Sequence, residues 1–418
     1  MTVDGVDVDR LASVVGTPFH LYSAGVLRAR YARVARAFEG LDVGIRYAVK
    51  ANGNAAILRL LYELGAGFDL VSGGEYVRAR RIGADPSRLV IAGVGKREDE
   101  MRLVLRDGIG VYHIESEAEL DLLEAVVREL DTSVRVALRL NPDVGVDTHA
   151  YIATGKKESK FGVDFNTAAR LVERIADIRG IELIAYHVHL GSLLFDVEPY
   201  LEACHKVLAW MDEEPLRARG ITHYDMGGGF GSSGPFDERA LDLEALGRGM
   251  SGLLAKRGLA LLCEPGRFLV GDAGVLVTTL LYEKCGASKD FYVVDAAMTD
   301  LIRPSLYGAT HEIREVVTST RLRERVVDVV GPVCESGDWL GKDRALPALE
   351  AGARLAVFQA GAYGMSMASN YNTRPKPAEL LCSEGRVQCI ARRQALEDLW
   401  RDECDETIEL PRELRTES

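Results

Sequence analysis

The feature that most constrains how this chain folds is a repeated succession of a short apolar run and a longer helical pattern. The succession recurs between residues 43 and 267. It is typical of parallel β/α units, because each strand needs a crossover connection before the next parallel strand can form. The predicted strands are 43–51, 67–72, 88–93, 111–115, 134–141, 181–190, 222–227 and 259–264. Eight such strands favour an α/β fold in which a (β/α)8 barrel of the TIM type is closed.

A second domain is expected beyond the barrel. After residue 268 the helical patterns give way to β-rich runs. These runs are 291–294, 324–330 and 354–358. The segment 18–22 also has the pattern of a strand, so the N-terminal segment is expected to join the second domain. The expected organisation is an N-terminal segment at 1–26, a barrel at 27–267 and a C-terminal β-rich domain, a Greek-key-like barrel or sandwich, at 268–418.

The net charge and the cysteine content limit the kinds of molecule that this protein is expected to bind. There are 51 Lys and Arg residues against 63 Asp and Glu residues, and the net charge of −12 argues against binding to nucleic acid or to an anionic membrane. The acidic start of the chain lacks the features of a secretory signal, and no apolar run approaches the roughly 18 residues of a membrane span. The 7 cysteines show no metal-ligand spacing, so no metal site is expected. We expect a cytoplasmic protein that acts on a small molecule.

Polar residues occur at several predicted strand ends, where (β/α)8 barrels place their active sites. Lys50 ends the first strand, and a buried amine is costly unless it is neutralised, paired or used covalently. The alternative is that Lys50 has no chemical role and only extends its amine to solvent at the barrel rim. Asp69 lies near the end of the second strand, where helix capping is an alternative explanation for the residues that follow. Alternation along the sixth strand puts His187 and His189 on one face, although a buried histidine often has only a structural role.

The loops after the seventh and eighth strands indicate a phosphate site. They read GGGFG at 227–231 and EPGR at 264–267. Glycines let backbone N–H groups approach phosphate oxygens closely, although a glycine run alone is also typical of a flexible loop. Together with Ser192 and Arg267, these loops favour a phosphate-bearing cofactor.

A phosphate site, a lysine and a carboxylate at one barrel mouth match the needs of pyridoxal phosphate. In this hypothesis Lys50 binds the aldehyde of the cofactor covalently. Glu264 keeps the ring nitrogen protonated, and His189 packs against the ring.

The chain also resembles the fold-type III pyridoxal-phosphate decarboxylases, the group that includes ornithine, diaminopimelate and arginine decarboxylases. The resemblance covers nearly the whole chain and is closest to the diaminopimelate-specific branch. The matching motifs, in order, are YAVKAN (47–52), GAGFDLVSGGE (65–75), TGKKESKFG (154–162), HLGS (189–192), GGGFG (227–231), EPGR (264–267), LIRPSLY (301–307), CESGD (334–338) and GAYGMSMASNYN (361–372).

The resemblance implies roles for individual residues. The implied cofactor-binding residues are Lys50, Asp69, His189, Ser192, Gly228, Gly229, Glu264, Gly266, Arg267 and Tyr363. The implied substrate-binding residues are Arg267, Arg303, Tyr307, Glu335 and Tyr363, and the implied catalytic residues are Lys50, Cys334, His189 and Glu264. Cys334 and Glu335 would reach the site from a partner subunit, so the resemblance implies a homodimer with shared active sites. Either Cys334 or Lys50 would then donate the proton that completes the reaction.

The implied reaction is the decarboxylation of meso-diaminopimelate to L-lysine and carbon dioxide. One departure bears on the substrate. Family members usually follow HxGS with Gln and a polar residue, whereas this chain has Leu193, Leu194 and Phe195. Ornithine, lysine, arginine or a carrier-bound amino acid therefore stay open as alternative substrates. A racemase or a non-catalytic relative is less favoured, because the CESGD motif and Lys50 are retained.

Residues 156–162 are a candidate lid by their charge and position.

Overall fold

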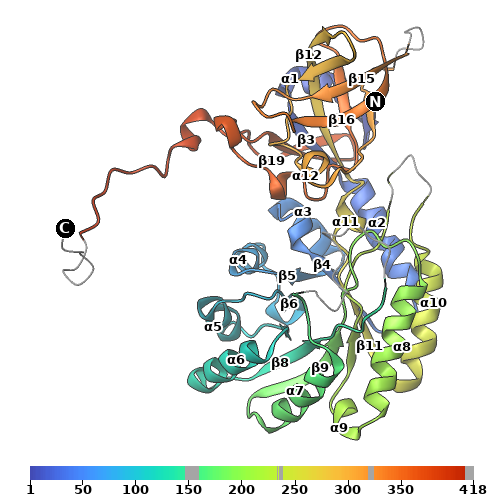
Figure 1. Ribbon diagram of the computed structural model, residues 1–418, viewed down its shortest axis with the longest axis vertical. Coiled ribbons are helices and arrows are strands. Elements are labelled where there is room, and N and C mark those ends of the chain that lie inside the picture. Colours follow the sequence, from blue (N-terminus) through green and yellow to red (C-terminus); the bar gives the residue numbers. More distant parts are fainter. Residues whose placement is uncertain (146–159, 233, 235–238, 319–323, 410–418) are drawn as a thin grey trace.

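The computed structural model describes residues 1–145, 160–232, 234, 239–318 and 324–409. Residues 156–159 of the candidate lid, and the first residues of the motif that contains them, lie outside these ranges. The chain forms a barrel surrounded by helices and a second, β-rich body beside it (Figure 1). Among the described residues, no helix combines the length and the apolar character that a membrane crossing requires.

The eight predicted strands form one closed parallel barrel, in the order β10-β11-β4-β5-β6-β7-β8-β9. Their bounds are β4 (Val43–Ala48), β5 (Gly67–Leu70), β6 (Leu89–Ile91), β7 (Val111–Ile114), β8 (Val134–Arg139), β9 (Ile181–His187), β10 (His223–Asp225) and β11 (Ala260–Cys263). The prediction of a (β/α)8 barrel is therefore confirmed.

Most of these strands end earlier than the apolar runs predict. The first run was expected to reach residue 51, but β4 ends at Ala48 and Val49–Ala51 form one turn of 3-10 helix, η1. The sixth run was expected to reach residue 190, but β9 ends at His187. Strand β9 ends level with its neighbours, because His187 pairs with Arg139 at the end of β8 and with Asp225 at the end of β10. Strand β4 continues past Ile45, its last partner in β11, and ends at Ala48 opposite Asp69. The last apolar residues of both runs therefore form the turns that carry the polar groups.

Helices surround the barrel (Figure 1). Their bounds are α2 (Ala24–Ala37), α3 (Ala55–Glu63), α4 (Gly73–Arg81), α5 (Glu98–Arg106), α6 (Glu117–Leu130), α7 (Phe165–Asp177), α8 (Glu198–Asp212), α9 (Pro215–Ala218), α10 (Leu243–Leu254) and α11 (Arg267–Val270). Several begin at a side chain that caps the first turn: Ser72 accepts from the N–H of Glu75, and Ser116 from that of Glu119. Helix α3 illustrates the packing, because Ile57, Leu58 and Leu61 are fully buried.

The second body is a β sheet in the order β16-β15-β13-β12-β3-β18-β19, and β17 pairs with both β12 and β14. Its strands are β3 (Phe19–Ser23), β12 (Gly274–Cys285), β13 (Asp290–Val294), β14 (Ile313–Glu315), β15 (Glu324–Val330), β16 (Trp339–Pro347), β17 (Arg354–Val357), β18 (Ala378–Ser383) and β19 (Arg386–Ala391). The expectation of a separate β-rich domain is confirmed. Strand β3 comes from the N-terminal segment and lies between β12 and β18, antiparallel to the first and parallel to the second.

Shorter elements complete the β domain and its links to the barrel. They are β1 (Thr2–Val3), β2 (Val6–Asp7), α1 (Val8–Val15), α12 (Arg303–Tyr307) and the 3-10 turns η4 (Met365–Met367), η5 (Tyr371–Thr373) and η6 (Leu396–Leu399). The 3-10 turns η2 (Pro86–Arg88) and η3 (Ala255–Arg257) belong to the barrel, where they precede β6 and β11. Alternation along β12 sends Leu276 and Leu280 into one apolar cluster and Val275 and Val277 into another. Both faces of this central strand are thus buried along its first half.

His20 in β3 predicts a loss of stability in mild acid. The side chain is fully buried and donates to the carbonyl oxygen of Asp300 at 3.2 Å. Burial lowers the pKa of His20 from 6.5 to about 4. The unfolded chain therefore binds this proton first, and stability is lost as the pH falls from 6.5 towards 4. We expect the free energy of unfolding of His20→Gln to fall less between pH 7 and pH 5 than that of the wild type, by about 2 kcal/mol. Urea titrations at both pH values measure this difference, and equal losses in the two proteins would contradict the prediction.

Candidate active site

An open cavity lies at the carboxyl ends of the barrel strands and has about 410 Å³ of empty space, solvent at its mouth included. It is lined by Ala48, Lys50, His189, Ser192, Leu193, Gly229, Phe230, Glu264, Gly266, Arg267, Phe268 and Tyr363. Eight of the residues singled out from the sequence are in this lining, although they come from distant parts of the chain. Tyr363 comes from the β domain, and its backbone N–H donates to the carbonyl oxygen of Ala51 at 2.8 Å. This bond fixes a loop of the second domain to the mouth of the barrel.

Lys50 and Asp69 form an ion pair at this mouth. The Nζ of Lys50 lies 3.0 Å from Oδ2 of Asp69, whose side chain is fully buried, while 39% of the lysine side chain is exposed. Burial opposes the charged amine, but Asp69 and other anionic groups outweigh burial and raise the pKa of Lys50. Burial, followed by repulsion from Glu264, raises the pKa of Asp69 to about 6. Both groups are therefore charged at neutral pH, and the lysine is held at the cavity by a buried carboxylate.

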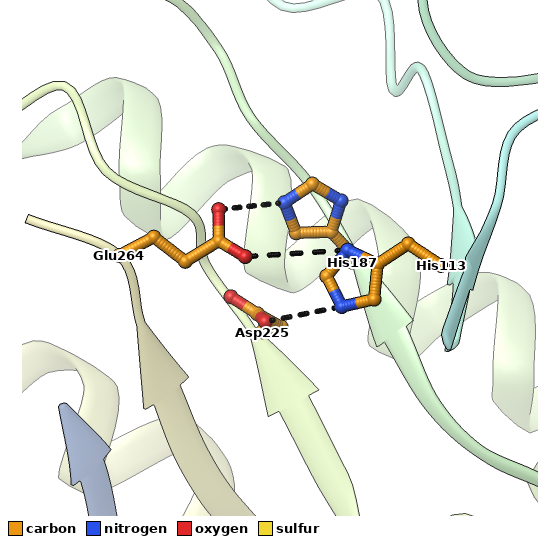
Figure 2. A group of neighbouring side chains, drawn as sticks. All are labelled: His113, His187, Asp225 and Glu264. Carbon is orange, nitrogen blue, oxygen red and sulfur yellow. Dashed lines mark ion pairs between the residues drawn. The ribbon is translucent and has the colours of Figure 1, made fainter. Parts of the chain in front are cut away.

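Glu264 belongs to a buried group of four titratable side chains in the barrel interior (Figure 2). Its Oε2 lies 3.3 Å from Nε2 of His187, and its Oε1 lies 4.0 Å from Nδ1 of His113. Asp225 completes the group, with Oδ2 3.7 Å from Nε2 of His113. Oε1 of Glu264 has no hydrogen-bond partner among the described residues. This buried carboxylate oxygen can therefore accept a hydrogen bond from a donor in the cavity.

Burial sets the charge of this group. It lowers the pKa values of His113 and His187 well below the ordinary value, so both rings are neutral. Burial and the nearby Glu264 raise the pKa of Asp225 well above its ordinary value. One oxygen of Asp225 accepts from the backbone N–H of Gly227 at 2.9 Å, which connects the group to the glycine loop.

The glycine loop lies so close to neighbouring backbone that side chains do not fit. A Cβ on Gly228 would lie 2.2 Å from the carbonyl oxygen of Glu264, and one on Gly229 would lie 2.1 Å from that of Gly191. The φ of Gly229 is +89°, a region that other residues rarely adopt. The N–H of Gly228 donates to Nδ1 of His189 at 3.1 Å, so the ring of His189 carries its proton on Nε2. These contacts explain why the sequence has glycine at both positions.

Two arginines give the site a positive side. Arg267 begins α11 with its guanidinium 4.7 Å from the centre of the Tyr363 ring, and Arg303 begins α12 with only 8% of its surface exposed. Burial lowers the pKa of Arg267, and burial together with repulsion from Arg267 lowers the pKa of Arg303 to about 9. The side chain of Tyr307 lies near both guanidinium groups, and its electrostatic interaction with them raises their pKa values in part. Among the described residues, neither arginine has a carboxylate in ion-pair contact, so an anionic ligand would stabilise both.

Cys334 and Glu335 do not line the cavity within a single chain. Both are exposed, in the connection between β15 and β16. The N–H of Cys334 donates to the side-chain oxygen of Asn372 at 2.7 Å, which fixes the loop locally. In the single chain, these two residues are therefore separate from the other predicted site residues.

The apolar segment after HLGS contacts the glycine loop through its backbone. Leu194 donates its N–H to the carbonyl oxygen of Gly229 and accepts from the N–H of Gly231, at 2.9 and 2.8 Å. Leu193 has a φ of +60° and lines the cavity, whereas Leu194 is buried. Of the three residues that depart from the family pattern, Leu193 is thus the one that lines this cavity.

Sequence reasoning missed several residues of the barrel interior. His113 was assigned no role, and Arg139, the last residue of β8, forms a buried ion pair with Glu115 at 2.8 Å. Arg139 also lowers the pKa of Asp69, so it contributes to the electrostatics of the site. The signal was present, because polar residues at the ends of the fourth and fifth strands follow the same rule that singled out Lys50.

Comparisons with known proteins agree with this geometry. Residues 24–271 match the family model described as pyridoxal-dependent decarboxylase, pyridoxal binding domain.

The chain belongs to the pyridoxal-dependent decarboxylases.

Among curated members of this decarboxylase family, the chain is 41% identical to a diaminopimelate decarboxylase of Aquifex aeolicus, over 94% of this chain and 93% of the relative. It is 42% identical to that of Pseudomonas aeruginosa, over 96% of each chain. The crystal structure of the Helicobacter pylori diaminopimelate decarboxylase complexed with L-lysine superposes with a TM-score of 0.90 at 40% identity, over 94% of this chain and 98% of the other. A lysine/ornithine decarboxylase from Vibrio vulnificus, at 21% identity and a TM-score of 0.78, shares the fold.

The residues at the decarboxylase cavity fit pyridoxal phosphate. The unpartnered Oε1 of Glu264 can accept a hydrogen bond from a protonated ring nitrogen, and Lys50 provides an amine for an aldehyde. The loop at Gly228 and Gly229 has no room for side chains and presents backbone, as a phosphate cradle requires.

Gly229→Ala tests the glycine loop. The added Cβ would lie 2.1 Å from the carbonyl oxygen of Gly191, and the φ of +89° is itself unfavourable. We expect a loss of about 3 kcal/mol or more in the free energy of unfolding, and weaker binding of pyridoxal phosphate. Gly83→Ala is the matched control, because Gly83 has a φ of +83° and open space around it, so that only about 1 kcal/mol should be lost. Equal losses in the two variants, measured by urea unfolding, would show that the close contact is not the cause.

Proposed function

We propose that this chain decarboxylates meso-diaminopimelate to L-lysine and carbon dioxide, with pyridoxal phosphate as its cofactor. The relatives that are 40 to 42% identical over nearly the whole chain are diaminopimelate decarboxylases. The observation that carries the choice of substrate is the pair of arginines, Arg267 and Arg303, without carboxylate partners among the described residues. A substrate with a second carboxylate at its far end suits these two cations, whereas a substrate with a cationic far end does not.

The lining of the cavity supports the proposed cofactor-binding roles. We assign Lys50 to covalent attachment of the aldehyde, and Asp69 to holding the lysine at 3.0 Å. We assign Glu264 to the ring nitrogen and His189 to the face of the ring. Ser192, Gly228, Gly229, Gly266, Arg267 and Tyr363 form the proposed phosphate and cofactor cradle. When bound, pyridoxal phosphate supplies an electron-withdrawing ring that accepts the electron pair left behind by departing carbon dioxide.

Side chains of the protein then position charge and donate protons at the site. Glu264 lies 3.3 Å from the neutral ring of His187 in the barrel interior, and the same glutamate lines the cavity. His189 presents Nε2–H, because its Nδ1 accepts from the backbone of Gly228. The proton that replaces the lost carboxylate comes from Lys50, which is protonated when free, or from Cys334.

We assign the far end of the substrate to groups on both domains. Arg267, Arg303, Tyr307 and Tyr363 would bind the carboxylate that is retained, and Glu335 would bind the far amino group. Arg303 begins a short helix of the β domain and Arg267 follows the last barrel strand, so the proposed subsite joins the two domains.

We further propose a homodimer in which Cys334 and Glu335 of each subunit complete the active site of the other. Their exposure on a loop outside the cavity supports this arrangement, because a partner subunit can reach them there.

We also propose a cytoplasmic location. The seven cysteines are free thiols, as is typical of proteins in a reducing compartment.

The substrate assignment is tested by carbon dioxide release from the purified, pyridoxal-phosphate-loaded protein. We expect turnover of meso-diaminopimelate with lysine as product, and at least about 100-fold lower kcat/KM for L-lysine, L-ornithine, L-arginine and their D forms. Lys50→Ala is the control. It should lose turnover and should retain no cofactor covalently after borohydride treatment. Preference for another amino acid would overturn the substrate assignment and direct attention to Leu193. Full activity of Lys50→Ala would overturn the role of the lysine.

Shared active sites are tested by mixing two inactive variants. We expect Lys50→Ala and Cys334→Ala to be nearly inactive alone and to regain activity when unfolded and refolded together. Random pairing gives about half heterodimers with one intact site each, so about a quarter of the wild-type activity should return. Size-exclusion chromatography checks that the mixture is dimeric. A dimeric mixture that stays inactive would show that each active site is built from one chain.

A further inference from the structure

Arg303 is held by a buried histidine to which no role has been given. The guanidinium Nη1 lies 2.9 Å from Nε2 of His311, eight residues further along the chain. His311 is fully buried, and its Nδ1 lies 2.8 Å from the carbonyl oxygen of Phe358. The arginine is therefore attached, through this ring, to the backbone that follows β17.

The two hydrogen bonds fix the state of the histidine ring. A carbonyl oxygen only accepts, so Nδ1 must carry the proton that is donated to Phe358. A guanidinium only donates, so Nε2 must present its lone pair to Arg303. Burial and repulsion from Arg303 lower the pKa of His311 to about 3, in agreement with a neutral ring. A protonated ring would lose the acceptor and place a second cation beside the arginine.

The local backbone explains why the two side chains meet. Helix α12 ends at Gly308, which has a φ of +62°, and the chain then turns into β14. Strand β14 pairs antiparallel with β17, with Ile313 opposite Val357, and the N–H of Phe358 donates to the carbonyl oxygen of Glu312 at 2.8 Å. The ring of His311 thus lies between a rigid two-stranded ladder and the first residue of α12.

The bond leaves part of the guanidinium available. Nη1 is engaged by His311, whereas Nη2 makes no hydrogen bond to another described residue. The Nε is fully buried and also has no partner among the described residues. A guanidinium is planar, so fixing one nitrogen limits the directions in which the others can donate. It also reduces the side-chain entropy that is lost when an anion is bound.

We propose that His311 is a positioning residue that orients Arg303 for the far carboxylate of the substrate and so determines the preference for an amino acid that carries one. This inference rests on the proposed function, because it concerns the subsite to which that function assigns Arg303. The histidine acts as a neutral acceptor and does not itself contact the substrate.

The test compares the binding of L-lysine with that of cadaverine to the pyridoxal-phosphate-loaded enzyme. The two molecules differ by the carboxylate that Arg303 is proposed to bind, so the ratio of their inhibition constants reports on this subsite alone. In His311→Leu, which has no acceptor, we expect lysine to bind about tenfold more weakly or worse, and cadaverine to change by less than about twofold. KM for diaminopimelate should rise more than kcat falls.

Two further variants separate positioning from folding. Arg303→Lys should reduce the lysine preference, and adding His311→Leu to it should cause little further loss, because the histidine acts through the arginine. His311→Gln can offer an amide oxygen near the position of Nε2 and should retain the preference within about threefold. It also serves as the test if His311→Leu fails to fold, and loss of the preference in a folded His311→Gln would overturn the proposal.

The outcomes distinguish this inference from the proposed function. If the wild type shows no preference for lysine over cadaverine and does not turn over diaminopimelate, the proposed function fails. If the wild type and Arg303→Lys behave as expected but His311→Leu weakens both ligands equally, or neither, the role of His311 is overturned while the function stands.

Discussion

The parallel pairing of β11 with β4, from Leu261 opposite Val43 to Cys263 opposite Ile45, closes the ring of strands. Without this closure the first and last barrel strands would be the two edges of an open sheet. Lys50 follows β4 and Glu264 follows β11, so the same hydrogen bonds bring the lysine and the carboxylate to one cavity. The glycine loop lies next to both because β10 pairs with β11. Backbone pairing thus brings the ends of these strands to one edge of the barrel, whichever side chains follow them.

Charge balance is the second constraint on this rim. Lys50 is paired with Asp69 at 3.0 Å, whereas Oε1 of Glu264 has no hydrogen-bond partner among the described residues. Arg267 and Arg303 have no carboxylate in ion-pair contact within the same set. Unpaired buried charges cost free energy, and a ligand that carries a ring cation, a phosphate and a carboxylate would offset this cost. The unpaired charges of the protein therefore favour a ligand that carries the complementary charges.

The β domain is required for the site as well as for the fold. Strand β3 inserts the N-terminal segment between β12 and β18, so segments from before and after the barrel build this domain together. The loop with Tyr363 is bonded to Ala51, and Arg303 is held through His311 by the backbone after β17. The barrel thus supplies most of the cofactor site, while the β domain supplies residues that face the far end of a substrate. This division suits a family in which one cofactor serves several amino acids.

The sequence by itself determined the eight strands, the β-rich second domain and most residues of the cavity, because apolar periodicity and polar strand ends are local signals. It did not give the strand ends, since β9 stops level with β8 and β10, and the apolar residues after β4 form a 3-10 turn. Nor did it single out His113, Arg139 or His311. His113 and Arg139 lie at or next to the ends of barrel strands, where the rule that singled out Lys50 also applies, whereas His311 precedes β14 and has no local signature. Only the tertiary structure decided their partners, because the contacts join segments far apart in the chain, as between His113 and Glu264 or between His311 and Phe358.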